Sequence, residues 1–502
     1  MIDLLVISPI LVPLLTLIVC LIPRISAKTS DAISLTSAGV LLACVSWLLI
    51  TVVSHGTLTL RAGGWAPPFG IVLVADTLSA LMLWISAFVA FVVLIYGVRS
   101  GPDALSPGHL HVLIHGLIHG LMLGVNGSFL TGDLFNLYVW FEVMLISSFI
   151  LMVREGHHSQ LPGGLTYVLL NLLASALFLS GAGLIYGKLG TLNLADMAAK
   201  LGALQDPDLV NTSGALIFVA FAAKAALFPF HFWLPASYHR AAPAISALFA
   251  GLLTKVGVYA LLRLFTLVFT PANGFSTTLI LYLSMATMIL GVLGAVAQYH
   301  IRRLLAFHII SQIGYMTAGL ALGGELALTA VIFYVLHHIA VKSTLFLVGG
   351  VLEARTGSPD IRHHGGFYQS SPLLALCFLI PAFSLGGIPP LSGFWAKLNL
   401  LQAGIETGRW LFIATALIVG ILTLFSMIKI WNESFWKAPA SDHPRPATNT
   451  GGRPFLAMLS LCGLTLVFSL GGAFVFRLAQ RAAGELADPS GYLDAVLKGG
   501  TL

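Results

Sequence analysis

Long apolar runs, separated by short polar connections, repeat along the whole 502-residue chain. A helix crosses the hydrocarbon core of a bilayer with about 20 predominantly apolar residues, and hydropathy finds about fourteen runs of that length. We therefore predict an all-α, polytopic membrane protein. The expected spans lie near residues 5–23, 31–54, 72–97, 110–128, 131–153, 163–187, 212–233, 242–268, 276–298, 303–323, 326–351, 372–397, 408–431 and 453–478.

The composition agrees with this pattern. Hydrophobic residues make up 58% of the chain and charged residues 9%, which leaves too few polar side chains to cover a soluble globule. The longest polar connections, 188–211, 352–371 and 432–452, are too short to be separate domains. Asp3 stands where a cleaved signal peptide would have basic residues, so we expect the first run to be a permanent helix.

Charge and cysteine usage exclude several classes of function. The net charge of +6 is typical of basic anchors at a membrane interface, so we expect a lipid bilayer and no nucleic acid as partner. The four cysteines fall inside apolar runs without paired spacing, which argues against disulfides and metal ligation. Nucleotide-binding and metalloprotease motifs are missing too, so we expect no cofactor, no metal and no enzyme activity.

The distribution of basic residues predicts the topology. Alternate connections hold thirteen Lys and Arg residues on one side, among them Arg24, Arg99, Arg154 and Arg445, and eight on the other, among them Arg263. The richer side is predicted to be cytoplasmic, which places both termini outside.

Five charged residues remain inside the predicted spans: Glu142, Lys224, Lys255, Lys342 and Lys397. A charge at the centre of a bilayer costs about 2.5 to 3.5 kcal/mol even on the scale that penalises it least. Two explanations stay open, proton conduction and static salt bridges. Because buried charges in membrane helices mark ion pathways, we favour proton conduction.

Two of the lysines lie beside expected helix interruptions. Lys224 precedes Pro229, and Lys397 follows the Gly386–Pro390 segment. Proline breaks or kinks a helix and frees backbone carbonyls, which membrane depth tolerates only next to protein or water. Two interrupted spans suggest repeated halves. Glu142 lies about ten residues, or roughly 15 Å, into its helix, where it either tunes a neighbouring lysine or pairs with one.

Histidines extend this set of candidates. His338 and Lys342 are four residues apart and share a helical face, with His337 beside them. Imidazoles titrate near neutral pH, so such neighbours would exchange protons as a coupled set. Weaker candidates are His231, close to Pro229, and the stripe of His308, Ser311 and Gln312, which either lines a water chain or serves packing.

A second histidine stripe occurs in the fourth span, where His111, His115 and His119 recur every four residues. This spacing puts the three imidazoles on one helical face. A metal site is one interpretation, but carboxylate or cysteine neighbours are missing from the local sequence. We therefore favour a polar seam against another helix.

Three stretches resemble a known family of membrane proteins. They are Gly132–Val143, Ala244–Tyr259 and Ala306–Met316, which include Glu142, Lys255 and His308. They are similar to the antiporter-like subunits shared by Mrp-type sodium/proton antiporters, respiratory complex I and membrane hydrogenases. Within this family the chain is most similar to the D-subunit branch of the Mrp antiporters. The histidine-rich fourth span departs from the family pattern.

The resemblance implies an architecture. It implies two inverted five-helix repeats, made of spans 4 to 8 and 9 to 13, with broken helices 7 and 12. The corresponding division is residues 1–108 for the first three helices, 109–268 and 269–431 for the repeats, and 432–502 for a loop, helix 14 and a C-terminal tail.

The resemblance also implies a function. The expected protein is the proton-translocating subunit of a multi-subunit Na⁺/H⁺ antiporter in the bacterial inner membrane, with the other subunits, protons and monovalent cations as partners. The alternative is a proton-pumping subunit of a redox-driven complex. The implied proton path runs through Glu142, Lys224, Lys255, His338, Lys342 and Lys397.

Overall fold

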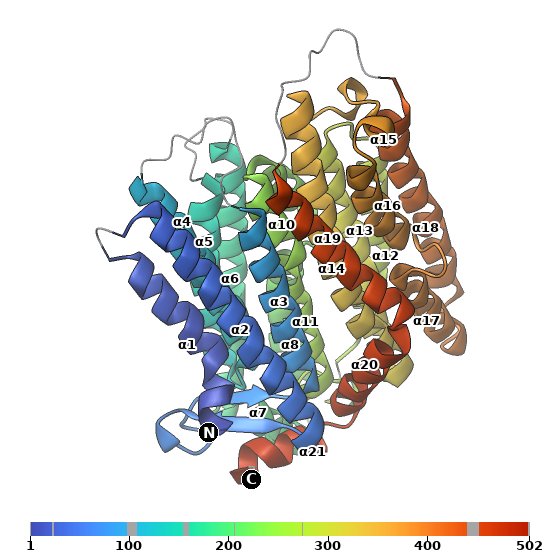
Figure 1. The fold of residues 1–502 in the computed structure, drawn as a ribbon. Coiled ribbons are helices and arrows are strands. Elements are labelled where there is room, and N and C mark those ends of the chain that lie inside the picture. The colour runs from blue at the N-terminus through green and yellow to red at the C-terminus, as the bar shows by residue number, and fades with distance from the viewer. Residues whose placement is uncertain are drawn as a thin grey trace.

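The computed structural model describes residues 2–22, 25–97, 108–153, 160–204, 206–273, 275–438 and 451–499. Long helices run alongside one another, and the two ends of the chain lie at the same end of the bundle (Figure 1). Four of the basic residues used to predict the topology, Arg24, Arg99, Arg154 and Arg445, lie outside the described residues.

The described residues of the first part of the chain form eleven α-helices. They are α1 (Ile2–Cys20), α2 (Ala27–His55), α3 (Thr77–Tyr96), α4 (Gly108–Leu130), α5 (Leu134–Val153), α6 (Leu161–Leu189), α7 (Leu194–Leu204), α8 (Pro207–Ala225), α9 (Trp233–Ser237), α10 (Pro243–Gly251) and α11 (Leu253–Leu267).

Ten more α-helices follow in the described residues. They are α12 (Thr278–Val296), α13 (Ile301–Leu322), α14 (Gly324–Thr356), α15 (Phe367–Ser370), α16 (Pro372–Gly386), α17 (Ser392–Glu406), α18 (Trp410–Trp431), α19 (Gly452–Leu470), α20 (Gly472–Ala487) and α21 (Ser490–Asp494).

Thirteen helical segments of the described chain are long and apolar enough to cross a membrane, against about fourteen expected. The difference lies at 372–397, where two helices of 15 residues each, α16 and α17, replace one continuous span. The expected span at 453–478 also ends early, because α19 stops at Leu470 and α20 starts at Gly472.

The helices confirm the predicted all-α class, and the described residues add one short antiparallel hairpin that was not predicted. Strand β1 (Leu58–Arg61) pairs with β2 (Val72–Ala75), with Leu58 opposite Ala75 and Arg61 opposite Val72. Residues 72–75 are apolar and run directly into α3, so hydropathy alone merged them with the span that follows. The Gly- and Pro-rich segment between the strands favours a turn.

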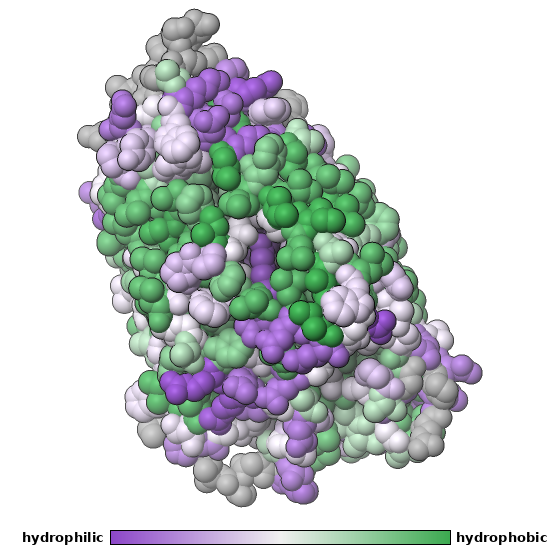
Figure 2. Space-filling model, turned by 90° about the vertical axis from the view of Figure 1, so that its right-hand side faces the viewer, coloured by the Kyte–Doolittle hydropathy of each residue, from purple (hydrophilic) through white to green (hydrophobic). Residues whose placement is uncertain are grey.

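The most buried helices form the centre of the bundle. The apolar windows of α14 and of the α10–α11 pair are completely buried, whereas only 28% of the residues in those of α1 and α2 are buried. Helix α14 packs against α10, α13, α16 and α17. One face of the molecule shows a broad apolar band between polar ends (Figure 2), which is the surface that a lipid-embedded protein needs.

Arg263 corrects the predicted charge distribution. The sequence count placed it in a connection, but its side chain is buried in α11, 5% exposed. Its Nη2 lies 2.6 Å from Oδ2 of Asp76, directly before α3. A buried partner offsets the cost of the buried guanidinium.

Candidate functional site

The four lysines predicted inside spans are all buried. Lys255 and Lys342 are 0% exposed, Lys224 is 5% exposed and Lys397 is 9% exposed. They lie on α8, α11, α14 and α17. Buried ammonium groups are expensive unless polar atoms surround them, so their contacts decide what each lysine can do.

Lys224 is connected to Glu142 through a serine. The Ser175 hydroxyl on α6 donates to Oε1 of Glu142 on α5 at 2.5 Å, and Nζ of Lys224 donates to the same hydroxyl oxygen at 3.4 Å. The ammonium also lies 4.8 Å from the ring centroid of Phe141. Ser175 was not among the predicted site residues. The sequence does hold a sign of it: Ser175 follows Asn171 by four positions in a mostly apolar run, so the two polar residues share a helical face.

The end of α8 positions Lys224 in its last turn. The helix stops at Ala225, because Ala226 takes a left-handed conformation, and Pro229, which has no N–H, keeps the chain from resuming the helix. Trp233 Nε1 donates to the Ala223 carbonyl at 2.9 Å, and the Phe228 N–H donates to Thr287 Oγ1 at 2.9 Å. Protein groups thus satisfy the freed backbone beside the lysine.

Lys255 lies at the junction of α10 and α11. Its Nζ donates to the Ala250 carbonyl, at the end of α10, at 2.5 Å. Its helix touches the end of α8, because a Cβ at Gly257 would lie 2.9 Å from the Ala225 nitrogen. Only glycine allows so close an approach. This contact brings the helices of Lys224 and Lys255 together.

Lys342 and His338 occupy adjacent turns of α14. Nζ of Lys342 donates to the Leu305 carbonyl of α13 at 3.3 Å. His338 is 0% exposed, and neither ring nitrogen has a hydrogen-bond partner among the described residues. Lys255 interacts electrostatically with both His338 and Lys342.

The polar stripe of α13 faces α14. The Tyr334 hydroxyl donates to Oε1 of Gln312. His308, Ser311 and Gln312 are completely buried. Both ring nitrogens of His308, Oγ of Ser311 and Nε2 of Gln312 have no hydrogen-bond partner in the described part of the chain. The stripe therefore belongs to the same interior as His338 and Lys342.

His337 faces the break between α16 and α17. Its Nδ1 lies 2.9 Å from Oγ of Ser392 and 3.4 Å from Oγ of Ser384. A Cβ at Gly393 would lie 1.8 Å from the Ser384 carbonyl oxygen, so glycine is required for this contact. The two serines were not among the predicted site residues.

Lys397 caps the helix that precedes it. Its Nζ donates to the carbonyls of Leu385 and Gly386 at 2.8 and 3.1 Å, at the end of α16. A cation is stabilised there by the negative end of the helix dipole. The ammonium also lies 5.4 Å from the ring centroid of Tyr315, whose ring stacks on Tyr334.

His231 stands apart from these contacts. It lies in the short 3-10 segment Phe230–Phe232, is partly buried, and has an Nδ1 without a hydrogen-bond partner among the described residues. The structure thus brings Glu142 and Lys224 into one cluster and groups the α13 stripe, the α14 histidines, Lys342 and Lys397 in another, with Lys255 between them.

A carboxylate from another helix lies beside the histidine stripe of α4. The local sequence shows no acidic neighbour for His111 and His115, but Asp31 of α2 lies against both. Eighty residues separate Asp31 from His111 in the chain, so local spacing could not reveal the contact.

Comparison with known proteins identifies the family. Residues 131–423, more than half of the chain, match the family described as NADH:quinone oxidoreductase/Mrp antiporter, TM. The chain is 43% identical to the D subunit of the Na(+)/H(+) antiporter of Alkalihalophilus pseudofirmus over 461 residues, covering 92% of each protein.

Solved structures share the fold over its full length. A chain in the structure of the Mrp complex from Dietzia sp. is 34% identical, with a TM-score of 0.92 and 99% of each chain covered. A chain of an archaeal respiratory membrane complex, the membrane-bound sulfane sulfur reductase, is 26% identical, with a TM-score of 0.89 over 99% of each chain. These similarities confirm the resemblance seen in the sequence motifs, and the chain belongs to the NADH:quinone oxidoreductase/Mrp antiporter family of membrane proteins as a homologue of the Mrp antiporter D subunit.

Proposed function

We propose that this chain is the D subunit of a multi-subunit Na⁺/H⁺ antiporter of the bacterial cell membrane and that protons move along its buried ionisable residues. The observation that supports this most is a succession of ionisable groups across touching helices. It runs from half-buried Glu142 and buried Lys224 to Lys255, then to the His338 and Lys342 cluster, with Lys397 beyond it. The other subunits, monovalent cations and protons are its partners.

Glu142 is the control point of this path. A carboxylate favours the ammonium form of a nearby lysine, and losing that charge favours proton release. Ser175 donates to the carboxylate and accepts from Lys224, so it transmits a change at one group to the other. A proton released from Lys224 then passes toward Lys255.

Water completes the path between groups that do not touch. Buried polar atoms normally find a protein or water partner. His308, Ser311, Gln312 and His338 have buried polar atoms without protein partners in the described residues. We assign these atoms to a hydrogen-bonded water chain between Lys342 and Lys397, with His337 beside it. His231 lies farther away and lines an entry from one membrane face.

The interruptions after α8 and α16 correspond in this proposal to broken helices 7 and 12 of two inverted repeats, residues 109–268 and 269–431. Lys224 lies within one turn of the first break. Lys397 donates to a carbonyl at the second break. Freed carbonyls and helix ends supply polar contacts at membrane depth, where an intact helix offers none.

A flux measurement tests the proposal. Vesicles containing the complete complex would be loaded at one pH, and proton movement followed with a pH-sensitive dye after Na⁺ is added. Lys224→Ala and Glu142→Ala should each reduce Na⁺-dependent proton flux at least tenfold, because each removes a step of the path. Lys188→Ala is the matched control, since Lys188 is exposed at the end of α6. Undiminished flux in both site variants would contradict the assignment.

The rival function is a redox-driven pump, favoured by the similarity to a chain of the sulfane sulfur reductase. The same vesicles discriminate between the two. Proton movement that needs an electron donor and ignores Na⁺ would establish the redox function. Movement that follows the Na⁺ gradient without a donor would establish antiport.

A further inference from the structure

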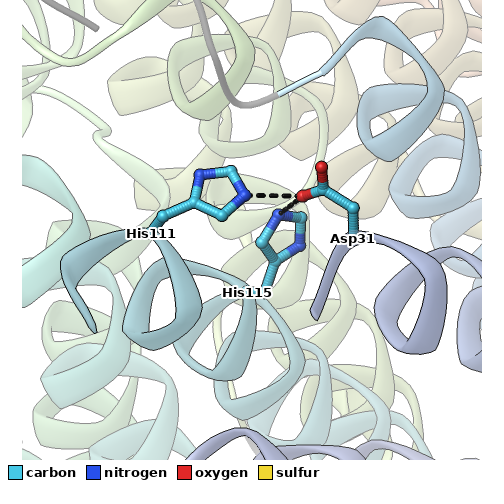
Figure 3. Close-up of side chains that lie close together, drawn as sticks. All are labelled: Asp31, His111 and His115. Carbon is cyan, nitrogen blue, oxygen red and sulfur yellow. Dashed lines mark hydrogen bonds and ion pairs between the residues drawn. The ribbon is translucent and has the colours of Figure 1, made fainter. Parts of the chain in front are cut away.

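Asp31 of α2 and the histidines His111 and His115 of α4 meet in one cluster near the starts of both helices (Figure 3). Nε2 of His111 lies 2.6 Å from Oδ1 of Asp31, and Nε2 of His115 lies 2.8 Å from the same oxygen. The histidines occupy successive turns at the start of α4, and Asp31 lies near the start of α2. Nothing in the proposed proton path uses these residues.

The two imidazoles project from one helix, α4, and each points its Nε2 at Asp31. Their ring centroids are 4.9 Å apart with an interplanar angle of 64°. One turn further along α4, Nε2 of His119 lies 2.9 Å from Oγ of Ser34, on the same face of α2 as Asp31. This second contact fixes α4 against α2, so the three groups converge without further folding.

We propose that Asp31, His111 and His115 form a binding site for a divalent transition-metal ion of the Zn²⁺ class. Two imidazole nitrogens and one carboxylate oxygen suit zinc and its neighbours, whereas Ca²⁺ and Mg²⁺ prefer sets of oxygen ligands. Two histidines at positions i and i+4 of a helix present their nitrogens on one face, as a shared ion requires.

The dimensions of the cluster fit such an ion. With metal–ligand bonds of about 2.0 to 2.1 Å, neighbouring ligand atoms of a tetrahedral site are roughly 3.3 Å apart. The three candidate ligand atoms all lie within 4.8 Å of one another. Because Asp31 bonds directly to both imidazoles, its oxygen would move away by roughly half an ångström to admit the ion.

Exposure of the cluster gives the ion a way in. The side chain of Asp31 is 43% exposed, while those of His111 and His115 are 10% and 5% exposed. The two histidines are thus the buried part of the cluster, and the carboxylate is the part that solvent reaches. With three protein ligands, a fourth position remains for water. A bound ion would join the ends of α2 and α4 and neutralise the carboxylate.

Cobalt binding tests the site directly. The full-length chain would be purified in detergent without a polyhistidine tag, stripped with a chelator and titrated with Co²⁺, whose visible absorption reports tetrahedral ligation. We expect one Co²⁺ per chain, displaced by Zn²⁺. His111→Ala, His115→Ala and Asp31→Asn should each weaken binding at least tenfold. His55→Ala, an exposed histidine at the far end of α2, should bind as the wild type does.

Thermal unfolding separates loss of the site from loss of the fold. Zn²⁺ should raise the midpoint of the wild type and of His55→Ala, because an ion that binds the folded state stabilises it. The ligand variants should melt cooperatively without that shift. The proposal is overturned if His111→Ala and His115→Ala retain wild-type affinity. It is equally overturned if the wild type binds no Co²⁺ at about 1 mM free ion, which would leave the cluster a hydrogen-bonded ion pair.

Discussion

Lys224 and Lys397 are both held beside a helix interruption, but their charges are compensated in different ways. Lys224 reaches a carboxylate through Ser175, whereas Lys397 bonds to two carbonyls at the end of α16. A carboxylate can change its charge and a carbonyl cannot. At the residue scale, we therefore expect the Glu142 cluster to be the part of the proposed path that responds to protonation, while Lys397 is held by groups whose charge does not change.

Ser175→Ala should separate Glu142 from Lys224 without disturbing the fold. Removing one hydroxyl of a hydrogen-bonded network costs about 1 kcal/mol of stability, but the two ionisable groups lose their link. We expect Na⁺-dependent proton flux to fall severalfold and its pH profile to shift, measured in vesicles containing the complex. Ser180→Ala is the control, because Ser180 is exposed on α6 and its hydroxyl donates to the Ala176 carbonyl of its own helix.

His364 lies in a connection outside the membrane spans, and it makes the stability of the folded protein depend on pH. It is buried in the connection that leads from α14 to α16, with Nδ1 3.0 Å from Oγ of Ser434 and Nε2 3.0 Å from the Ser358 carbonyl. Burial lowers the pKa of His364 below its ordinary value of 6.5. The unfolded chain therefore binds the proton first, and stability that is complete above pH 6.5 falls as the pH drops below it.

Thermal unfolding between pH 5 and pH 8 measures this effect. His364→Gln should lower the unfolding midpoint at pH 8. Between pH 8 and pH 5, however, its midpoint should fall by less than that of the wild type. The exposed neighbour His363 supplies the control His363→Gln. An acid-induced loss in His364→Gln as large as that of the wild type would assign the pH dependence to other groups.

At the scale of elements, glycine decides how closely the site helices approach. A Cβ at Gly393 would overlap the Ser384 carbonyl oxygen and lie 3.0 Å from Nε2 of His337. The start of α17 therefore packs directly on the end of α16, and His337 reaches both helices. The same logic applies at Gly257, where α11 meets the end of α8.

Gly393→Ala should push α17 away from α16. Overpacking of this kind typically costs about 1 to 3 kcal/mol, and the displacement should also separate His337 from its two serines. We expect a lower unfolding midpoint together with reduced flux. Gly463→Ala on α19 is the matched control, because a Cβ there meets no atom within 4 Å. If both variants behaved alike, close packing at Gly393 would not matter for the site.

The number of spans could be predicted to within one, because it depends on local hydropathy. The buried lysines could be found because a charge in an apolar run is visible at once. Ser175 and Asp31 could not, since each meets its partner across 33 or 80 residues of chain. The β1–β2 hairpin was missed because Val72–Ala75 is as apolar as the helix that follows it. Contacts between distant segments, rather than composition, thus determine which polar groups act together.

A buried ion pair connects α3 with α11, and a cation–π contact of the same arginine reaches α21. Arg263 of α11 pairs with Asp76 before α3 at 2.6 Å, and its guanidinium lies 5.1 Å from the ring centroid of Tyr492 in α21. The two charged side chains are only 6% and 3% exposed. Breaking such a pair leaves an unpaired buried charge, at a cost of about 3 to 5 kcal/mol.

Arg263→Ala should therefore lower the unfolding midpoint strongly and loosen the C-terminal helices, which limited proteolysis would detect as earlier cleavage after α20. Asp76→Asn should behave similarly, because it leaves the guanidinium without its counter-charge. Asp494→Ala removes a partner of Lys498 in a pair whose side chains are 63% and 75% exposed, and should change little. Equal midpoints for Arg263→Ala and Asp494→Ala would mean that the pair contributes no more than a solvated surface contact. Neither Arg263 nor Asp76 belongs to the proposed proton path, although Arg263 shares α11 with Lys255. Arg263→Ala protein that remains assembled should therefore still conduct protons, so that this variant loses stability without losing transport.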